Sequence, residues 1–181
     1  PLEDMTLPKI TAVSADVDIM SSRQEAVVKG TFDLVNASDE PIKTVYVNEP
    51  SSHDEDNRLI EIRGAKVITD TDLAKDLKDY SYRTFEFDPP LAPGAKTSMA
   101  FEIFYHAPRL GDGSSIRTNG TFINNFAVMP NIGIQENYMT NPDKRRKYDL
   151  PEKEKRADRD DAKARSRHFI SANSDYVDFE A

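Results

Sequence analysis

Alternation of apolar and polar side chains, repeated in short segments, is the feature that most limits what this chain can fold into. The clearest example is residues 97–105, in which one side of the pattern consists of Thr97, Met99, Phe101, Ile103 and Tyr105. A period of two places successive side chains on opposite faces of a β-strand. The sequence therefore predicts strands with one buried face.

The same period recurs along the first half of the chain. It predicts strands at residues 10–19, 28–34, 42–47, 59–68 and 80–87, with a bulge at Gly64 in the fourth. Turn-forming sequences lie between them, such as NASDEP at 36–41 and PPLAPG at 89–94, and residues 70–79 favour at most a short helix. Short links join the first three strands, so we expect an antiparallel meander. The fold class predicted is all-β, an antiparallel β-sandwich or saddle-shaped sheet.

The sequence changes character after Pro142. Residues 143–168 are densely charged and lack an apolar stripe, which predicts a charged helical or disordered insertion near the C-terminus. The apolar pattern resumes at Phe169. We therefore expect three parts: a β-sandwich domain at 1–142, the charged insertion at 143–168, and the final strand of the same domain, truncated, at 169–181.

Composition restricts the partners of the chain. With 181 residues and 38% hydrophobic content, the chain is long enough for one domain with a core. Residues 143–167 hold 11 of the 24 Lys and Arg but only 7 of the 32 Asp and Glu, so the rest carries a net charge of −12. A body of that sign repels phosphate backbones, so no nucleic-acid partner is expected. No apolar run reaches the roughly 20 residues that span a bilayer, so we expect no direct membrane insertion of this segment.

No complete set of catalytic groups is visible in the sequence. The chain has no Cys, and its three histidines, His53, His106 and His168, stand apart without metal-ligand spacing. Acidic pairs such as Asp16 with Asp18 fit solvated loops better than a calcium loop, which needs a spaced ligand set. Nucleophile-elbow, phosphate-loop and dinucleotide motifs are absent. We therefore expect no catalytic residue, no metal site and no cofactor in this chain.

One stretch of the chain is distinctive: residues 119–136, NGTFINNFAVMPNIGIQE. Apolar residues on both sides of Asn124 and Asn125 predict a buried strand around these two amides. Buried amides need hydrogen-bond partners. They either bridge neighbouring backbone, which is a structural role, or face a cavity.

Five segments of the chain resemble those of a known family. They are this stretch, NPDKRRKYDLP, PKITAVSADVDI, VKGTFDLVNASDEPI and PPLAPGAKTSMAFEIFY. Together they resemble the N-terminal β-domain of aminopeptidase N-like zinc metallopeptidases. The similarity is to the bacterial branch in which a peptidase-like region is joined to an ABC-transporter permease. The resemblance implies a saddle-shaped domain that covers one side of a separate catalytic domain. It also implies that the parent protein is an integral membrane protein, with this domain outside the bilayer.

The resemblance implies a function in which this chain is not itself the catalyst. The zinc and its ligands would lie in the catalytic domain of the same polypeptide, which is the expected partner together with the peptide substrate. The parent would be a zinc metalloaminopeptidase or a pseudo-enzyme of that family. In this chain the strand Thr121–Asn124 and the break Met129-Pro130 match the family's amine-binding region. Asn124, with Asn125 beside it, is then the candidate substrate-binding residue.

Two other functions remain open from the sequence. The first is a freestanding β-sandwich module that binds a glycan or protein, with Tyr80, Tyr82 and Tyr105 as an aromatic platform. The second is a structural domain of a membrane transporter complex. A cleft wall would leave an apolar docking face exposed, whereas a freestanding module would not.

Overall fold

The computed structural model describes residues 5–50, 58–106, 116–117, 119–133, 142–147, 149 and 177–181. The chain divides into two compact units. The smaller comprises Pro1–Asp4 and Ile134–Tyr176, in which α3 (Pro142–Lys147) is described. The larger comprises Met5–Gly133 and Val177–Ala181 and holds the β-structure.

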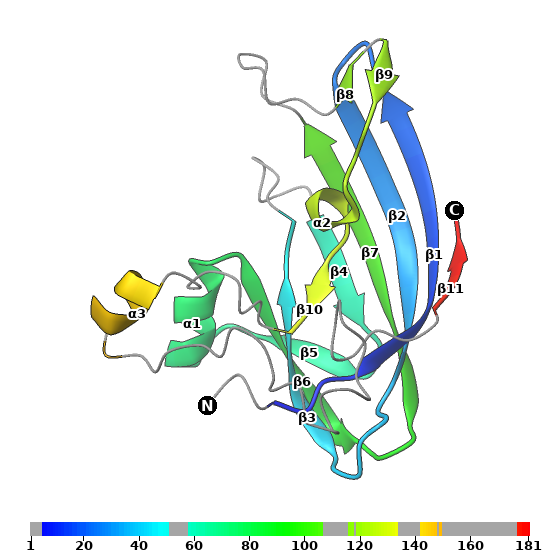
Figure 1. Cartoon of the computed structure of the whole chain (residues 1–181). Coiled ribbons are helices and arrows are strands. Elements are labelled where there is room, and N and C mark those ends of the chain that lie inside the picture. Colours follow the sequence, from blue (N-terminus) through cyan, green and yellow to red (C-terminus); the bar gives the residue numbers. More distant parts are fainter. Residues whose placement is uncertain are drawn as a thin grey trace, which may run out of the picture. The chain divides into compact units, whose positions relative to one another are not determined.

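Among the described residues, the larger unit contains a five-stranded sheet with the order β11-β1-β2-β7-β4. Its neighbours are antiparallel except for β1 and β11, which are parallel. Figure 1 shows β1, β2 and β7 as long curved strands lying side by side. The members are β1 (Lys9–Met20), β2 (Glu25–Val35), β4 (Arg58–Ile62), β7 (Lys96–His106) and β11 (Asp178–Glu180).

A second sheet, of four described strands, has the order β10-β3-β6-β5 and is antiparallel throughout. Its members are β3 (Ile42–Asn48), β5 (Ala65–Ile68), β6 (Tyr82–Leu91) and β10 (Asn131–Ile132). A small hairpin joins β8 (Ile116–Arg117) to β9 (Gly120–Thr121). The described part of the unit also contains two short helices, α1 (Asp72–Lys78) and α2 (Asn125–Val128).

Both sheets contribute side chains to one core. The apolar residues on alternate positions of β2 and β7 pack with those of β3, β4 and β6, and Val128 of α2 joins them. In Figure 1, α2 lies over one face of the five-stranded sheet, where it contacts β7. We call this core-facing side the inner face and the opposite side the outer face. Buried alternate positions are what the period-two pattern predicts, and the all-β, antiparallel fold class is confirmed.

The path between the strands differs from the meander that we expected. β2 pairs with β7, which is distant in sequence, and β3 pairs with β6 in the other sheet. The predicted strand 59–68 is also wrong: it forms β4 and β5, which belong to different sheets. The chain turns between them at Gly64, whose φ is +81°. Glycine adopts this conformation without the steric cost that a side chain brings, so Gly64 marks a turn and not a bulge.

Two further expectations about local structure need correction. PPLAPG was predicted to be a turn, but β6 continues through Pro89 and Pro90 to Leu91, and the turn follows at residues 92–95. The buried strand around Asn124 is also absent. β9 ends at Thr121, residues 122–124 form a loop, and α2 begins at Asn125. Of the charged insertion 143–168, the structure describes residues 143–147, within α3, and Asp149; the rest lies outside the described residues.

Candidate functional site

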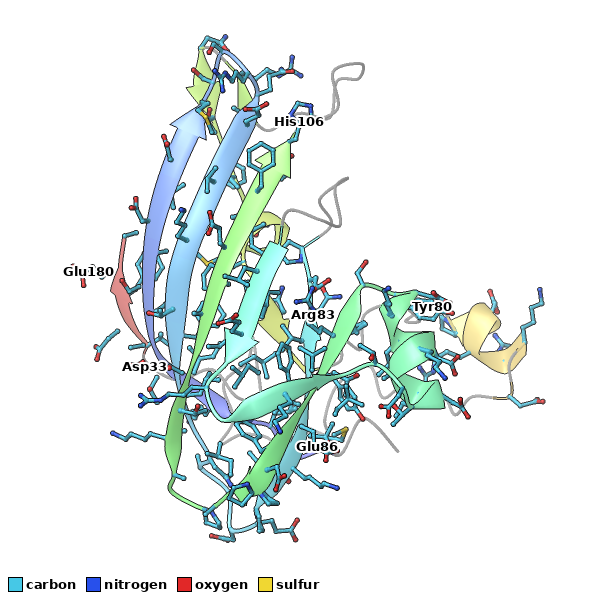
Figure 2. The ribbon with its side chains drawn as sticks, turned by 180° about the vertical axis from the view of Figure 1, so that it is seen from behind. Asp33, Tyr80, Arg83, Glu86, His106 and Glu180 are labelled. Carbon is cyan, nitrogen blue, oxygen red and sulfur yellow. The ribbon has the colours of Figure 1, made fainter. Side chains whose placement is uncertain are left out.

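The outer face of the five-stranded sheet carries a row of small side chains. The strand registers align Glu180, Ser14, Thr31, Ala100 and Glu61 across all five strands. The three central members are small, and an acidic residue stands at each end. Figure 2 views this face, with Glu180 and Asp33 labelled near its β11 edge. Small side chains flanked by longer ones leave the middle of the sheet hollowed.

Two adjoining hollows of about 580 and 450 Å³ occupy this face and share Ser14, Thr31 and Glu180. We call them together the outer groove. The close approach of strands beneath it depends on Gly30, since a Cβ there would lie 2.5 Å from the Ser14 carbonyl oxygen. The groove is shallow and open to solvent.

The charges around the outer groove are mostly acidic. In the neighbouring row, Asp16 stands opposite Lys29, which stands opposite Glu102. The Lys29 Nζ atom lies 2.9 Å from Glu102 Oε1. The hydrogen bond and the charge of Glu102, with a smaller contribution from Asp16, raise the pKa of Lys29 above its ordinary value of 10.5. Lys29 therefore stays charged at neutral pH and forms an ion pair with Glu102. Asp16 and Asp18 are exposed.

The loop 121–125 holds the two candidate substrate-binding residues. Asn124 and Asn125 are both exposed, and Phe122 is 77% exposed. The loop is fixed at both ends: β9 pairs with β8, whose Ile116 is fully buried, and Val128 and Pro130 are buried on the other side. Asn124 and Asn125 are therefore exposed residues, adjacent in the chain, and do not lie in the buried strand that their apolar neighbours predicted.

Where the structure describes them, the other polar residues singled out in the sequence do not assemble into a catalytic set. Of the histidines, His106 lies 3.4 Å from a Glu25 carboxylate oxygen at the end of the sheet, and His53 and His168 are outside the described residues. Of the ion pairs between described residues, the most buried joins Arg83 on β6 to Glu49, which follows β3, at 2.6 Å. Its partners neutralise each other, which is a structural role.

The three tyrosines of the expected aromatic platform do not share a surface. Tyr82 is buried, and Tyr105 is partly buried against the core. Tyr80 is 74% exposed in the turn that follows α1. An aromatic platform requires several exposed rings side by side. The described tyrosines therefore do not form one.

The described residues contain no group of three or more His, Asp or Glu side chains that could hold a metal ion. Within the same part of the chain, no helix has the length and apolar character needed to cross a membrane. Two exposed features stand out in the described part of the chain: the outer groove and the loop 121–125. Sequence reasoning missed the groove because the small residues Ser14, Thr31 and Ala100 align only once the strand pairing is known.

Comparisons with known proteins give no match: no family model, curated protein or solved structure matches this chain.

Proposed function

We propose that this chain is a non-catalytic β-domain of a larger aminopeptidase N-like protein, in which it forms one wall of the peptide-binding cleft. The observation that carries the proposal is the loop 121–125, where a 77% exposed Phe122 stands beside the exposed amides of Asn124 and Asn125. A large aromatic side chain held in solvent by a loop anchored at both ends suits a surface that packs against another domain.

The chemistry assigned to this surface is recognition of an amino group. The side-chain oxygen of Asn124 would accept a hydrogen bond from the free α-amino group of a peptide, without the added strength that a carboxylate brings. The described residues do not fit a zinc site. Zinc would therefore be held by a separate catalytic domain of the same polypeptide, where it would activate water for hydrolysis if the parent is an active enzyme.

The test uses the intact parent polypeptide. Asn124→Ala is expected to raise KM about tenfold for substrates with a free α-amino group, since a hydrogen bond to a charged donor is worth about 1.5–3 kcal/mol. Substrates with a blocked amino group should be unaffected. Asn119→Ala, at another exposed asparagine of the same stretch, is the matched control.

Two outcomes count against the proposal. One is zinc-dependent release of N-terminal residues by the purified chain alone, which would place the catalytic groups inside it. The other is a parent sequence without a peptidase-like domain.

Phe122→Ser should leave the stability of the isolated chain within about 0.5 kcal/mol, because an exposed side chain contributes little to folding. The same change should weaken contact with the neighbouring domain.

A freestanding binding module is the second candidate, and the outer groove favours it. Hydroxyl groups from Ser14 and Thr31 line the groove beside acidic residues. Such a surface suits a polar ligand or an extended peptide more than an apolar one. If Asn124→Ala and Phe122→Ser leave the parent protein unchanged while a substitution in the groove abolishes ligand binding, this candidate replaces the first.

A further inference from the structure

Strand β1 has a partner along only part of one edge. On one side it pairs with β2 over its full length, from Lys9 to Met20. On the other side, β11 pairs with residues 12–14 alone. Among the described residues, no strand pairs with this side of β1 between Ala15 and Met20. Half of the backbone N–H and C=O groups in that segment therefore point to an edge without a partner strand.

This edge already accepts an added strand. β11 is three residues long, lies parallel to β1, and comes from the far end of the sequence. All of its residues are exposed, and none belongs to the core. It therefore sits at the edge mainly through backbone pairing. The free segment of β1 continues the same edge in the same sheet. We call residues 15–20 the open edge.

The side chains of the open edge specify the chemistry of a partner. Asp16 and Asp18 point to the outer face, next to the outer groove. Val17 and Ile19 point to the inner face, opposite the buried Val28 and Ala26, and remain 41% and 43% exposed. An added strand therefore meets carboxylates on one face and uncovered apolar surface on the other. It gains most from alternating basic and apolar residues.

A second copy of this chain fits the open edge poorly. Two such edges that pair antiparallel about Val17 bring Asp16 of each copy opposite Asp18 of the other. Like charges directly opposite each other destabilise a strand pair. Natural sheets also use charge to protect an edge from association. Here, however, the charges lie on one face only, and the apolar face keeps its exposed Val17 and Ile19.

We propose that the open edge of β1 binds an extended peptide segment with alternating basic and apolar residues, which adds to the sheet as a further strand. The open edge is separate from the loop 121–125, so the proposal does not rest on the function proposed above. The basic side chains of the peptide lie against Asp16 and Asp18, and its apolar side chains cover Val17 and Ile19.

The test measures binding of a labelled octapeptide of alternating Lys and Val, blocked at both ends, to the full chain by fluorescence anisotropy. Asp16→Asn with Asp18→Asn is expected to weaken binding roughly tenfold, since two opposite-charge pairs across strands are lost. The matched control is Asp70→Asn with Asp76→Asn, which removes the same charge from exposed sites elsewhere. That control should retain binding within about twofold, as screened distant charges contribute little.

Two further measurements separate strand addition from simple charge attraction. A peptide of the same sequence methylated at every backbone nitrogen cannot donate backbone hydrogen bonds and should not bind, although its lysine side chains keep their charge. Amide hydrogen exchange of the full chain should slow within residues 15–20 when the parent peptide is added. The proposal is overturned if the methylated peptide binds equally, or if exchange slows only at other strands. It is also overturned if the free chain is a dimer whose contact already protects residues 15–20.

Discussion

Asn36 is a buried polar residue, and its side chain joins the turn at residues 36–40 to Leu91 at the end of β6. The Asn36 Nδ2 group donates to the carbonyl oxygens of Glu40 and Leu91, at 2.8 and 2.9 Å. Its Oδ1 atom accepts from the backbone N–H and the hydroxyl of Ser38, at 3.0 and 2.7 Å. These four hydrogen bonds satisfy the buried Asn36 amide. A substitution that keeps the side-chain volume but removes the N–H donors would leave the Glu40 and Leu91 carbonyl groups without this partner.

Asn36→Asp is therefore expected to destabilise the fold strongly. The substitution replaces an N–H₂ group that faces two carbonyl oxygens with an oxygen atom. We expect the free energy of unfolding to fall by about 3 kcal/mol or more, as for other unpaired buried polar groups. Denaturant titration measures it, and Ser38→Ala, which removes one hydroxyl from the partly exposed side of the same turn, should cost about 1 kcal/mol. Equal losses for the two variants would contradict this account.

Tyr46 gives the fold a dependence on alkaline pH. Its burial raises the pKa of the hydroxyl above the ordinary value of 10.0. The folded chain therefore holds this proton at pH values where the unfolded chain has lost it. The contribution to stability is complete below about pH 10 and is lost as pH rises through the folded pKa.

Tyr46→Phe should consequently make the alkaline loss of stability less steep, because the variant has no proton to lose at this site. Urea unfolding between about pH 9 and 11 measures the slope. Tyr80→Phe is the matched control, since Tyr80 is 74% exposed. If both variants lose stability as steeply as the parent chain, burial of Tyr46 is not the cause.

For single residues, the sequence predicted the local turn at Asn36 but neither its distant bonding partner nor the exposure of Asn124. NASDEP was predicted to be a turn, and Asn36 lies in one, but its bond to Leu91 spans 55 residues and has no local signal. The apolar neighbours of Asn124 predicted burial, yet the residue is exposed. Apolar composition alone does not show where a strand ends, and here β9 ends at Thr121.

Gly30 lies on β2, the middle strand of the five-stranded sheet, at a position without room for a side chain. A Cβ on this residue would lie 2.5 Å from the Ser14 carbonyl oxygen on β1 and 2.6 Å from Cζ of Phe101 on β7. The Phe101 ring also packs against Phe32, with ring centroids 4.9 Å apart. The ring thus covers the space that a side chain at position 30 would need.

Gly30→Ala should destabilise the sheet by about 1–3 kcal/mol, the usual cost of overpacking. The double variant with Phe101→Leu should show coupling between the two sites, because a smaller side chain relieves one of the two close contacts. The contact with Ser14 remains, so rescue should be partial. Thermal or denaturant unfolding measures all three variants. Additive losses would show that Phe101 does not limit the space at Gly30.

Strand existence was predictable in this chain, whereas strand pairing was not. The alternation in β1, β2, β3 and β7 is a local property, and their positions agree with the predicted ranges within a few residues. The partner of a strand depends on segments far away in sequence, as the pairing of β2 with β7 shows. For the same reason, the outer groove had no signature in the sequence.

On the scale of the whole molecule, the core is contained in a continuous part of the chain. Among the residues that the structure describes, every member of the core cluster and every apolar residue packed against it lies between Ile10 and Ile132. β11, which follows in sequence, is exposed throughout and adds only an edge strand. The described hydrophobic core of the larger unit is therefore built from residues before Gly133.

A chain that ends at Gly133 should consequently keep the fold of the larger unit. We expect cooperative thermal unfolding with a Tm within about 5 °C of the full chain, since a change of about 1 kcal/mol shifts Tm by several degrees in a domain of this size. A chain that ends at Ile123 is the control. It lacks the buried Val128 and the partly buried Met129 and Ile132. Full burial of one apolar side chain is worth about 1.5–3 kcal/mol, so this control should unfold more easily. Loss of cooperative unfolding in the longer truncation would mean that residues 134–181 are needed for the β-fold, and the chain would then be one folding unit.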